Sequence, residues 1–220
     1  MNTTTSPAAV PRVIAIDGPA GAGKSTVGRA VAARLGLEYL DTGAMYRAIT
    51  FAALRRGIDP ADAEDVAALA DGVEMTLDGS SVVVDGVDAT VEIRGREVTA
   101  AVSAVAANGR VRAELVRRQR AWVVAHGGGV VEGRDIGSVV FPDATLKLFV
   151  TASPRVRAER RVAEIGGDVA EVEASIIERD RKDSTRAESP LTETADAVIV
   201  DTTGLSIDEV VDRVLELMPA

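Results

Sequence analysis

Short apolar runs alternate with amphipathic segments along most of this chain. The apolar runs are too short for buried helices and are typical of strands that are covered on both faces. They fall at 13–17, 37–40, 130–132, 145–150 and 197–201. Strands that alternate with helices in this way predict a parallel α/β sheet.

The segments between these runs carry apolar residues at spacings of three and four, as expected of helices that bury one face. The first such stripe runs from Val27 to Leu35, and Gly36 ends it. The last one opens with Ser206 and Glu209, which fit a capping box. Helices are therefore predicted over 27–35, 44–56, 61–70, 99–125 (interrupted near 108–109), 155–165, 169–179 and 206–218.

One segment departs from the α/β pattern. Alternating apolar positions over 73–77 and 81–85 flank Asp78-Gly79, which predicts an antiparallel hairpin. A third strand is expected over 87–91. We interpret residues 71–94 as a small β insertion within an otherwise single domain.

Composition supports a globular domain. The chain has 220 residues, of which 46% are hydrophobic and 27% charged, and it has no cysteine. It therefore has enough apolar material for a core and no disulfide or thiolate chemistry. The chain contains no run of about 18 apolar residues, so the sequence predicts no membrane-spanning helix. Residues 1–12 are typical of a disordered tail and not of a signal peptide, so a cytoplasmic protein without a membrane partner is expected.

The charge balance narrows the class of partner. A net charge of −9 argues against a surface that coats a nucleic acid polymer. Only Lys24, Lys147 and Lys182 are lysines, and all other cations are arginines, whose planar guanidinium suits phosphate. Compositional bias explains the exposed arginines equally well, so motifs must decide.

A phosphate-binding motif follows the first predicted strand. Residues 18–25 match G-x-x-x-x-G-K-[ST] at every fixed position and open a helix. Backbone N–H groups of such a loop surround phosphate oxygens. Lys24 would reach the outer phosphates of ATP, and the Ser25 hydroxyl would ligate Mg²⁺. The predicted ATP-binding residues are Gly18, Pro19, Ala20, Gly21, Ala22, Gly23, Lys24, Ser25 and Thr26.

The phosphate loop alone leaves the protein class open. A GTPase would normally carry Asn-Lys-x-Asp, and neither Asn2 nor Asn108 lies in such a motif. A motor ATPase would usually be larger. Three further segments favour a kinase with a second anionic substrate: 40–47, 131–137 at the end of a predicted strand, and 178–186, interpreted as a charged loop.

These segments, with the phosphate loop and Ser189-Pro190-Leu191, resemble the bacterial cytidylate kinases of the nucleoside monophosphate kinase group. The resemblance runs from about Val13 to Met218. It implies a P-loop kinase fold with a five-stranded parallel sheet flanked by helices. The β insert would belong to a monophosphate-binding region at about 41–112, and a mobile helical LID would span about 155–186. The implied monomer transfers the γ-phosphoryl group of ATP to CMP or dCMP.

The resemblance also implies roles for single residues. Arg47 and Arg134 would bind the acceptor phosphate, and Asp135 with Arg112 would read cytosine; Arg110 is the alternative to Arg112. The implied CMP-binding residues are Asp41, Thr42, Gly43, Tyr46, Arg47, Ser103, Arg112, Gly133, Arg134, Asp135, Arg179, Asp183 and Arg186. The implied catalytic residues are Lys24, Arg134, Arg160, Arg161 and Arg186, and Arg157 would join the ATP site. Glu132 receives no role.

Several alternatives stay open at this point. Arg157, Arg160 and Arg161 are spaced to share one helix face toward the phosphoryl group, but a solvated Arg/Glu helix fits the same pattern. His126 precedes three glycines and is expected in solvent rather than as a catalytic base. Other small P-loop kinases (UMP, AMP or shikimate kinases) and a non-catalytic nucleotide-binding module are the rival functions.

Overall fold

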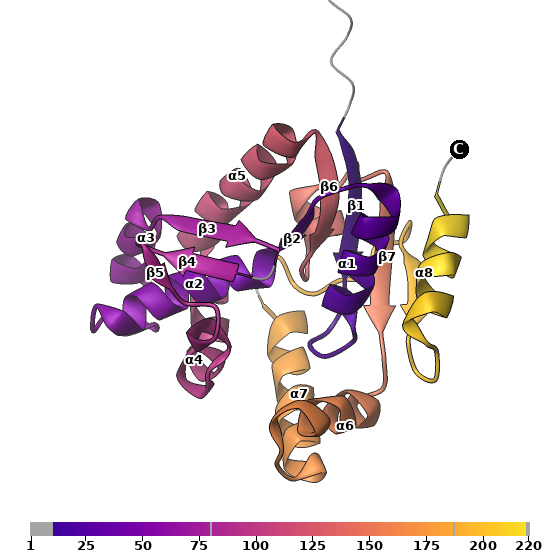
Figure 1. Cartoon of the computed structure of the whole chain (residues 1–220). Helices are drawn as coiled ribbons and strands as arrows, with labels where there is room; N and C mark the ends of the chain where they lie inside the picture. Colours follow the sequence, from indigo (N-terminus) through magenta and orange to yellow (C-terminus); the bar gives the residue numbers. More distant parts are fainter. Residues whose placement is uncertain (1–10, 80, 187, 219–220) are drawn as a thin grey trace, which may run out of the picture.

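A parallel sheet forms the centre of the computed structural model, which describes residues 11–79, 81–186 and 188–218. The described part contains a five-stranded sheet in the order β2-β6-β1-β7-β8 (Figure 1). Ile14 of β1 lies opposite Val130 of β6 and Leu146 of β7, which sets the register of the three central strands. The strands are β1 (Arg12–Asp17), β2 (Tyr39–Asp41), β6 (Gly128–Glu132), β7 (Leu146–Thr151) and β8 (Val198–Asp201).

Helices cover both faces of this sheet because its side chains alternate between two apolar layers. Ile14 and Ile16 pack in one layer with α1 (Lys24–Leu35) and α8 (Ile207–Glu216). Val13 and Ala15 face the other layer, together with α2 (Thr42–Arg55) and α5 (Gly109–His126). The apolar runs of the sequence therefore mark strands that are buried on both faces, as predicted.

The predicted β insert is present as a separate antiparallel sheet. β3 (Met75–Asp78), β4 (Ser81–Val84) and β5 (Val87–Asp88) lie between α3 (Ala63–Gly72) and α4 (Arg96–Ala107). Val82 and Val84 are buried in the layer that contains α2. The third strand is shorter than expected because the chain turns into a 3-10 turn at Glu92–Arg94.

Two helices lie beyond the carboxyl ends of the strands, α6 (Pro154–Ile165) and α7 (Val169–Ser184) (Figure 1). The prediction of a loop over 178–186 is wrong, because α7 continues through most of it. Glu178 accepts a hydrogen bond from Arg181 Nη2 at 2.8 Å and lies 3.7 Å from Lys182 Nζ. Such pairs at i,i+3 and i,i+4 favour the helical state of a charged segment.

Other boundaries also differ from the predictions. Asp41 caps α2 by accepting a hydrogen bond from the Ala44 N–H at 3.0 Å, so α2 begins at Thr42, two residues before its predicted start. The π-helical turn at Ile136–Val140 was not predicted. Of the predicted tail, residues 1–10 lie outside the described residues and Arg12 opens β1. Within the described ranges, no helix combines the length and apolarity needed to cross a membrane.

The capping box of α8 provides a test of the local structure. Ser206 Oγ accepts from the Glu209 N–H at 3.3 Å, and Glu209 Oε2 accepts from the Ser206 N–H at 2.8 Å. Ser206→Ala should lower the free energy of unfolding by about 1 kcal/mol in urea denaturation. Ser175→Ala, at an exposed position inside α7, should be neutral or slightly stabilising. Equal losses in both variants would contradict the capping role.

Candidate nucleotide-binding site

The phosphate loop, residues 18–25, joins β1 to α1 in a conformation that needs glycine. Gly18 has φ +144°, and a Cβ atom there would lie 1.9 Å from the Val150 carbonyl oxygen. Gly23 has φ 91° and is the residue from which α1 starts. The unpaired N–H groups of a helix start carry partial positive charge, so this loop suits an anion.

Lys24 lies inside this loop and is buried. Its ammonium donates a hydrogen bond to the Pro19 carbonyl oxygen at 2.8 Å. Burial lowers the pKa of Lys24 to about 7, and Arg134 adds to the effect, while Glu132 and Asp41 oppose it. The lysine is therefore only partly charged near neutral pH until an anion enters the loop.

Glu132 is a central site residue that sequence reasoning missed. The Ser25 hydroxyl donates to Glu132 Oε1 at 2.8 Å. Glu132 Oε2 and the Tyr39 hydroxyl are buried and have no hydrogen-bond partner within the described part of the chain. Burial raises the pKa of Glu132, and Asp41 adds to this. Its position at the carboxyl end of a strand beside the phosphate loop was the available signal.

These side chains fit a magnesium ion that arrives with a nucleotide. Among the described residues, no cluster of three or more His, Cys, Asp or Glu side chains could hold a metal by itself. Ser25 and Glu132 instead offer oxygen atoms at the mouth of the phosphate loop. Mg²⁺ usually takes few protein ligands and completes its shell with water and substrate phosphates. The unpartnered Glu132 oxygen is consistent with that arrangement.

Residues 133–137 bring the predicted acceptor residues beside the phosphate loop. Arg134 Nε donates to Asp183 Oδ2 at 2.9 Å. Arg112 forms a buried ion pair with Asp135, and its guanidinium lies 5.6 Å from the centre of the Tyr46 ring. Burial raises the pKa of Asp135, against the effect of Arg112. Arg110 points elsewhere, to Glu64 at 2.9 Å, and is exposed.

Several further cations lie close to one another in this part of the site. Arg47 Nη1 donates to the Ile93 carbonyl at 2.9 Å and to Thr99 Oγ1 at 3.0 Å. Burial lowers the pKa of Arg47 to about 10, and nearby Arg179 adds to this. The Nε atoms of Arg179 and Arg186 are buried without a hydrogen-bond partner among the described residues. Guanidinium groups with free donors suit phosphate oxygens.

The three predicted LID arginines lie on α6 at spacings of three and four, and Arg157 and Arg160 both lie beside the phosphate loop. Arg157 is buried and donates to the Ala20 carbonyl at 2.9 Å and to Asp180 at 2.6 Å. Arg160 donates to the Thr202 hydroxyl at 3.1 Å and carbonyl at 2.9 Å. Arg161 pairs with Glu164 at 3.2 Å.

The remaining predicted residues have structural contacts. Asp41, besides capping α2, lies 3.4 Å from Arg94 Nη2. The Thr42 hydroxyl donates to the Glu132 carbonyl at 2.7 Å. Gly133 allows a close approach, because a Cβ atom there would lie 2.8 Å from Thr42 Oγ1. Gly43 is exposed in α2, Ser103 is half-buried in α4, and His126 is exposed at the end of α5, where its ring stacks on Trp122.

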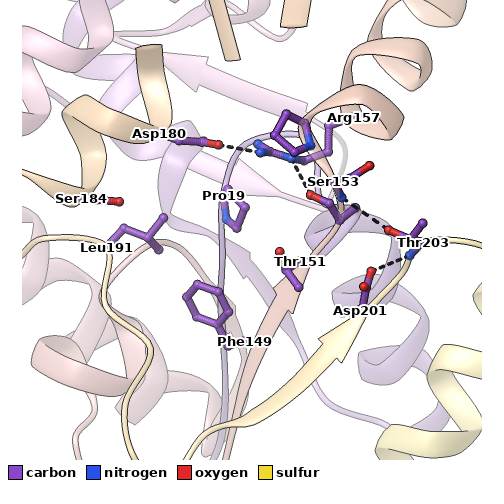
Figure 2. Close-up of a pocket in the computed structure, with 12 residues that line it drawn as sticks. Pro19, Phe149, Thr151, Ser153, Arg157, Asp180, Ser184, Leu191, Asp201 and Thr203 are labelled. Carbon is purple, nitrogen blue, oxygen red and sulfur yellow. Dashed lines mark hydrogen bonds and ion pairs between the residues drawn. The ribbon is translucent and has the colours of Figure 1, made fainter. Parts of the chain in front are cut away.

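A pocket of about 510 Å³ lies beside the phosphate loop. Figure 2 shows Asp180 and Ser184 of α7 on one side, and Thr151 and Asp201 at the ends of β7 and β8 on the other. Pro19, Phe149 and Leu191 supply apolar surface, and the Arg157–Asp180 pair spans the pocket. The pocket separates α7 from the sheet, so it leaves room for α7 to move.

Comparisons with solved structures agree with this fold. The chain resembles a gluconokinase from Sinorhizobium meliloti 1021, with a TM-score of 0.51 and 17% identity, over 94% of this chain and 91% of that one. A shikimate kinase from Bacteroides thetaiotaomicron gives a TM-score of 0.50 and 16% identity, over 94% and 97%. At such identities the likeness shows the P-loop kinase fold alone.

Several other proteins share much higher sequence identity with this chain. The chain is 49% identical over 215 residues to a cytidylate kinase of Mycolicibacterium paratuberculosis, covering 94% of each chain. It is 50% identical over 212 residues to one of Desulfitobacterium hafniense, covering 93% of this chain and 91% of that one. A bifunctional pantoate ligase/cytidylate kinase of Parasynechococcus marenigrum is 52% identical over 215 residues, and the match spans 93% of this chain but only 43% of that protein.

The extent of the sequence matches identifies the family of the chain. A sequence profile described as cytidylate kinase matches residues 14–220, which include the phosphate loop, the β insert, the 133–137 segment and both LID helices. This match and the relatives at about half identity show that the chain belongs to the cytidylate kinase family.

Proposed function

We propose that this protein transfers the γ-phosphoryl group of ATP to CMP or dCMP, giving ADP and CDP or dCDP. The observation that carries the proposal is the buried Arg112–Asp135 pair held next to a phosphate loop. A phosphate loop alone would suit many nucleotide-binding proteins, whereas this pair could also form hydrogen bonds with the base of an acceptor nucleotide. Membership of the cytidylate kinase family supports the same acceptor. The proposal includes a monomer in the cytoplasm that acts on small molecules.

The phosphate loop and Lys24 would bind the phosphates of ATP. The loop amides and the start of α1 favour the negative charge, and Lys24 exchanges its Pro19 contact for a phosphate oxygen. Mg²⁺, when bound, neutralises charge on the outer phosphates. Ser25 would hold it directly, and Glu132 orients the Ser25 hydroxyl from the opposite side.

Arg47 and Arg134 would bind the acceptor phosphate, with Arg179 and Arg186 nearby. Arg134 pairs with Asp183 at 2.9 Å in the structure. An incoming phosphate would either bind Arg134 together with Asp183 or displace Asp183 from it. The reaction needs no general base, because a nucleoside monophosphate with a second pKa of about 6 is mostly ionised at neutral pH. Catalysis then rests on bringing two anions together in line and compensating their charge.

Asp135 and Arg112 would read the base of the acceptor. A carboxylate accepts from the exocyclic amino group of cytosine, and an arginine donates to the ring acceptors. Uracil has a carbonyl where cytosine has the amino group. This carbonyl oxygen would face the Asp135 carboxylate, and two acceptors form no hydrogen bond. Both side chains are buried, where unpaired polar groups are most costly.

The helices α6 and α7 would close over the bound nucleotides. Closure excludes water that would otherwise hydrolyse ATP. The pocket between α7 and the strand ends gives this movement space. The closing segment would run from Ser153, the N-cap of α6, to Thr185, the C-cap of α7.

Acceptor choice tests the proposed function. A coupled ADP-release assay should show turnover with CMP and dCMP, and little with UMP, AMP or shikimate. Asp135→Ala should reduce the CMP:UMP preference by roughly 10- to 100-fold, given about 1–3 kcal/mol for each buried mismatch. Glu64→Ala, which removes the exposed ion pair between Glu64 of α3 and Arg110 of α5, is the control. Equal use of UMP by the unmodified protein would overturn the proposed base reader.

Proton uptake tests the role of Lys24. Because its pKa is about 7 in the empty site, Lys24 is mostly neutral at pH 8. Phosphate favours the charged form, so ATP binding at pH 8 should take up as much as about one proton. Calorimetry in buffers of different ionisation enthalpy measures this uptake.

Two variants complete that test. Lys24→Met should lose both the uptake and most of the turnover, while Lys182→Met, at an exposed site, should retain both. An unchanged proton uptake in Lys24→Met would assign the titrating group elsewhere.

LID closure predicts a pattern of amide hydrogen exchange. Exchange in α6 and α7 should slow when CMP and a non-hydrolysable ATP analogue are both present, and less with either one alone. Exchange in α3 and α8, which lie outside the closing segment, serves as the internal reference. Identical exchange of α6 and α7 with and without ligands would remove the LID assignment.

A further inference from the structure

Asp17 is a buried carboxylate to which the proposed reaction assigns no role. It is the last residue of β1 and directly precedes the phosphate loop. Oδ1 accepts a hydrogen bond from the Ile136 N–H at 2.8 Å, and Oδ2 accepts one from the Gly137 N–H at 2.7 Å. Asp17 forms no ion pair within the described ranges, so these two amides are its main partners.

These bonds fasten one end of residues 133–137, which we call the acceptor loop. The other end is held by the Gly133 N–H, which donates to the Ile16 carbonyl at 2.9 Å. Arg134 and Asp135 lie between the two attachment points, and their side chains reach Asp183 and Arg112. The acceptor loop is therefore attached at both ends to the last two residues of the strand that leads into the phosphate loop.

The attachment is specific for a carboxylate. Two oxygens accept from two adjacent amides, whereas an asparagine offers one acceptor and would direct its amino group at an N–H. Burial of this charge is costly and raises the pKa of Asp17 to about 6, although both amide hydrogen bonds lower it. Asp135 opposes ionisation and Lys24 favours it. A costly buried charge with two well-aligned partners is retained more readily for positioning than for stability.

We propose that Asp17 is a positioning residue that sets the distance and orientation between the phosphate loop and the acceptor loop. This inference rests on the proposed roles of Arg134 and Asp135 toward CMP. Phosphoryl transfer needs both substrates in line, and a displacement of about 1 Å can cost about 100-fold in rate.

The test compares Asp17→Asn and Asp17→Ala with Val214→Ala. Val214 is fully buried between α8 and the sheet, away from both loops, so its truncation reports on stability alone. We expect Asp17→Asn to lower kcat/KM for CMP on the order of 100-fold and to reduce the CMP:UMP preference. The dissociation constant of ATP should stay within about threefold, since the phosphate loop keeps its own contacts. Asp17→Ala should behave like Asp17→Asn, with a larger loss.

Kinetic constants are normalised to the fraction of protein that binds ATP in calorimetry, so partial unfolding of a variant does not hide the result. The proposal is overturned if Asp17→Asn only lowers the melting temperature, as Val214→Ala should, with KM, kcat and base preference unchanged. It is also overturned if ATP affinity falls as much as CMP turnover. Failure of the unmodified protein to phosphorylate CMP would instead remove the proposed function, and that measurement comes first.

Discussion

The site depends on one constraint, that the carboxyl ends of parallel strands meet at one edge of the sheet. Glu132 lies opposite Ile16 on β1 and Asp41 on β2, so three neighbouring strands end at the same level. The phosphate loop, the start of α2 and the acceptor loop all leave the sheet from these ends. Residues that are far apart in the sequence are therefore brought together at this edge.

Cations and carboxylates are packed closely together at this edge of the sheet. The net charge is −9, yet Lys24, Arg47 and Arg179 lie close enough for each pKa to be lowered by a neighbouring arginine as well as by burial. Burying cations together is unfavourable unless an anion shares the space. Glu132, Asp41 and Asp183 already share this space and oppose the effect, and phosphate groups would bring further negative charge to the same cations.

Sequence reasoning succeeded where a feature is local. The phosphate loop and the capping box of α8 are each defined by adjacent residues, and apolar runs located all the strands of the described sheet. It failed where the outcome depends on pairing across the fold. Nothing near Asp17 reveals that it accepts from the acceptor loop, and the strand-end position of Glu132 does not by itself reveal the contact with Ser25. Only the packing of α5 on the sheet separates Arg112, which is buried, from Arg110, which is exposed.

The two ends of the LID are attached to different substrate sites. Arg157, in the first turn of α6, donates to the Ala20 carbonyl of the phosphate loop. Asp183, in the last turn of α7, accepts from Arg134 of the acceptor loop. A phosphate in one site alone would alter one attachment and leave the other in place. Under the proposed closure, the LID would respond fully only when both loops are occupied, which is the condition under which excluding water is useful.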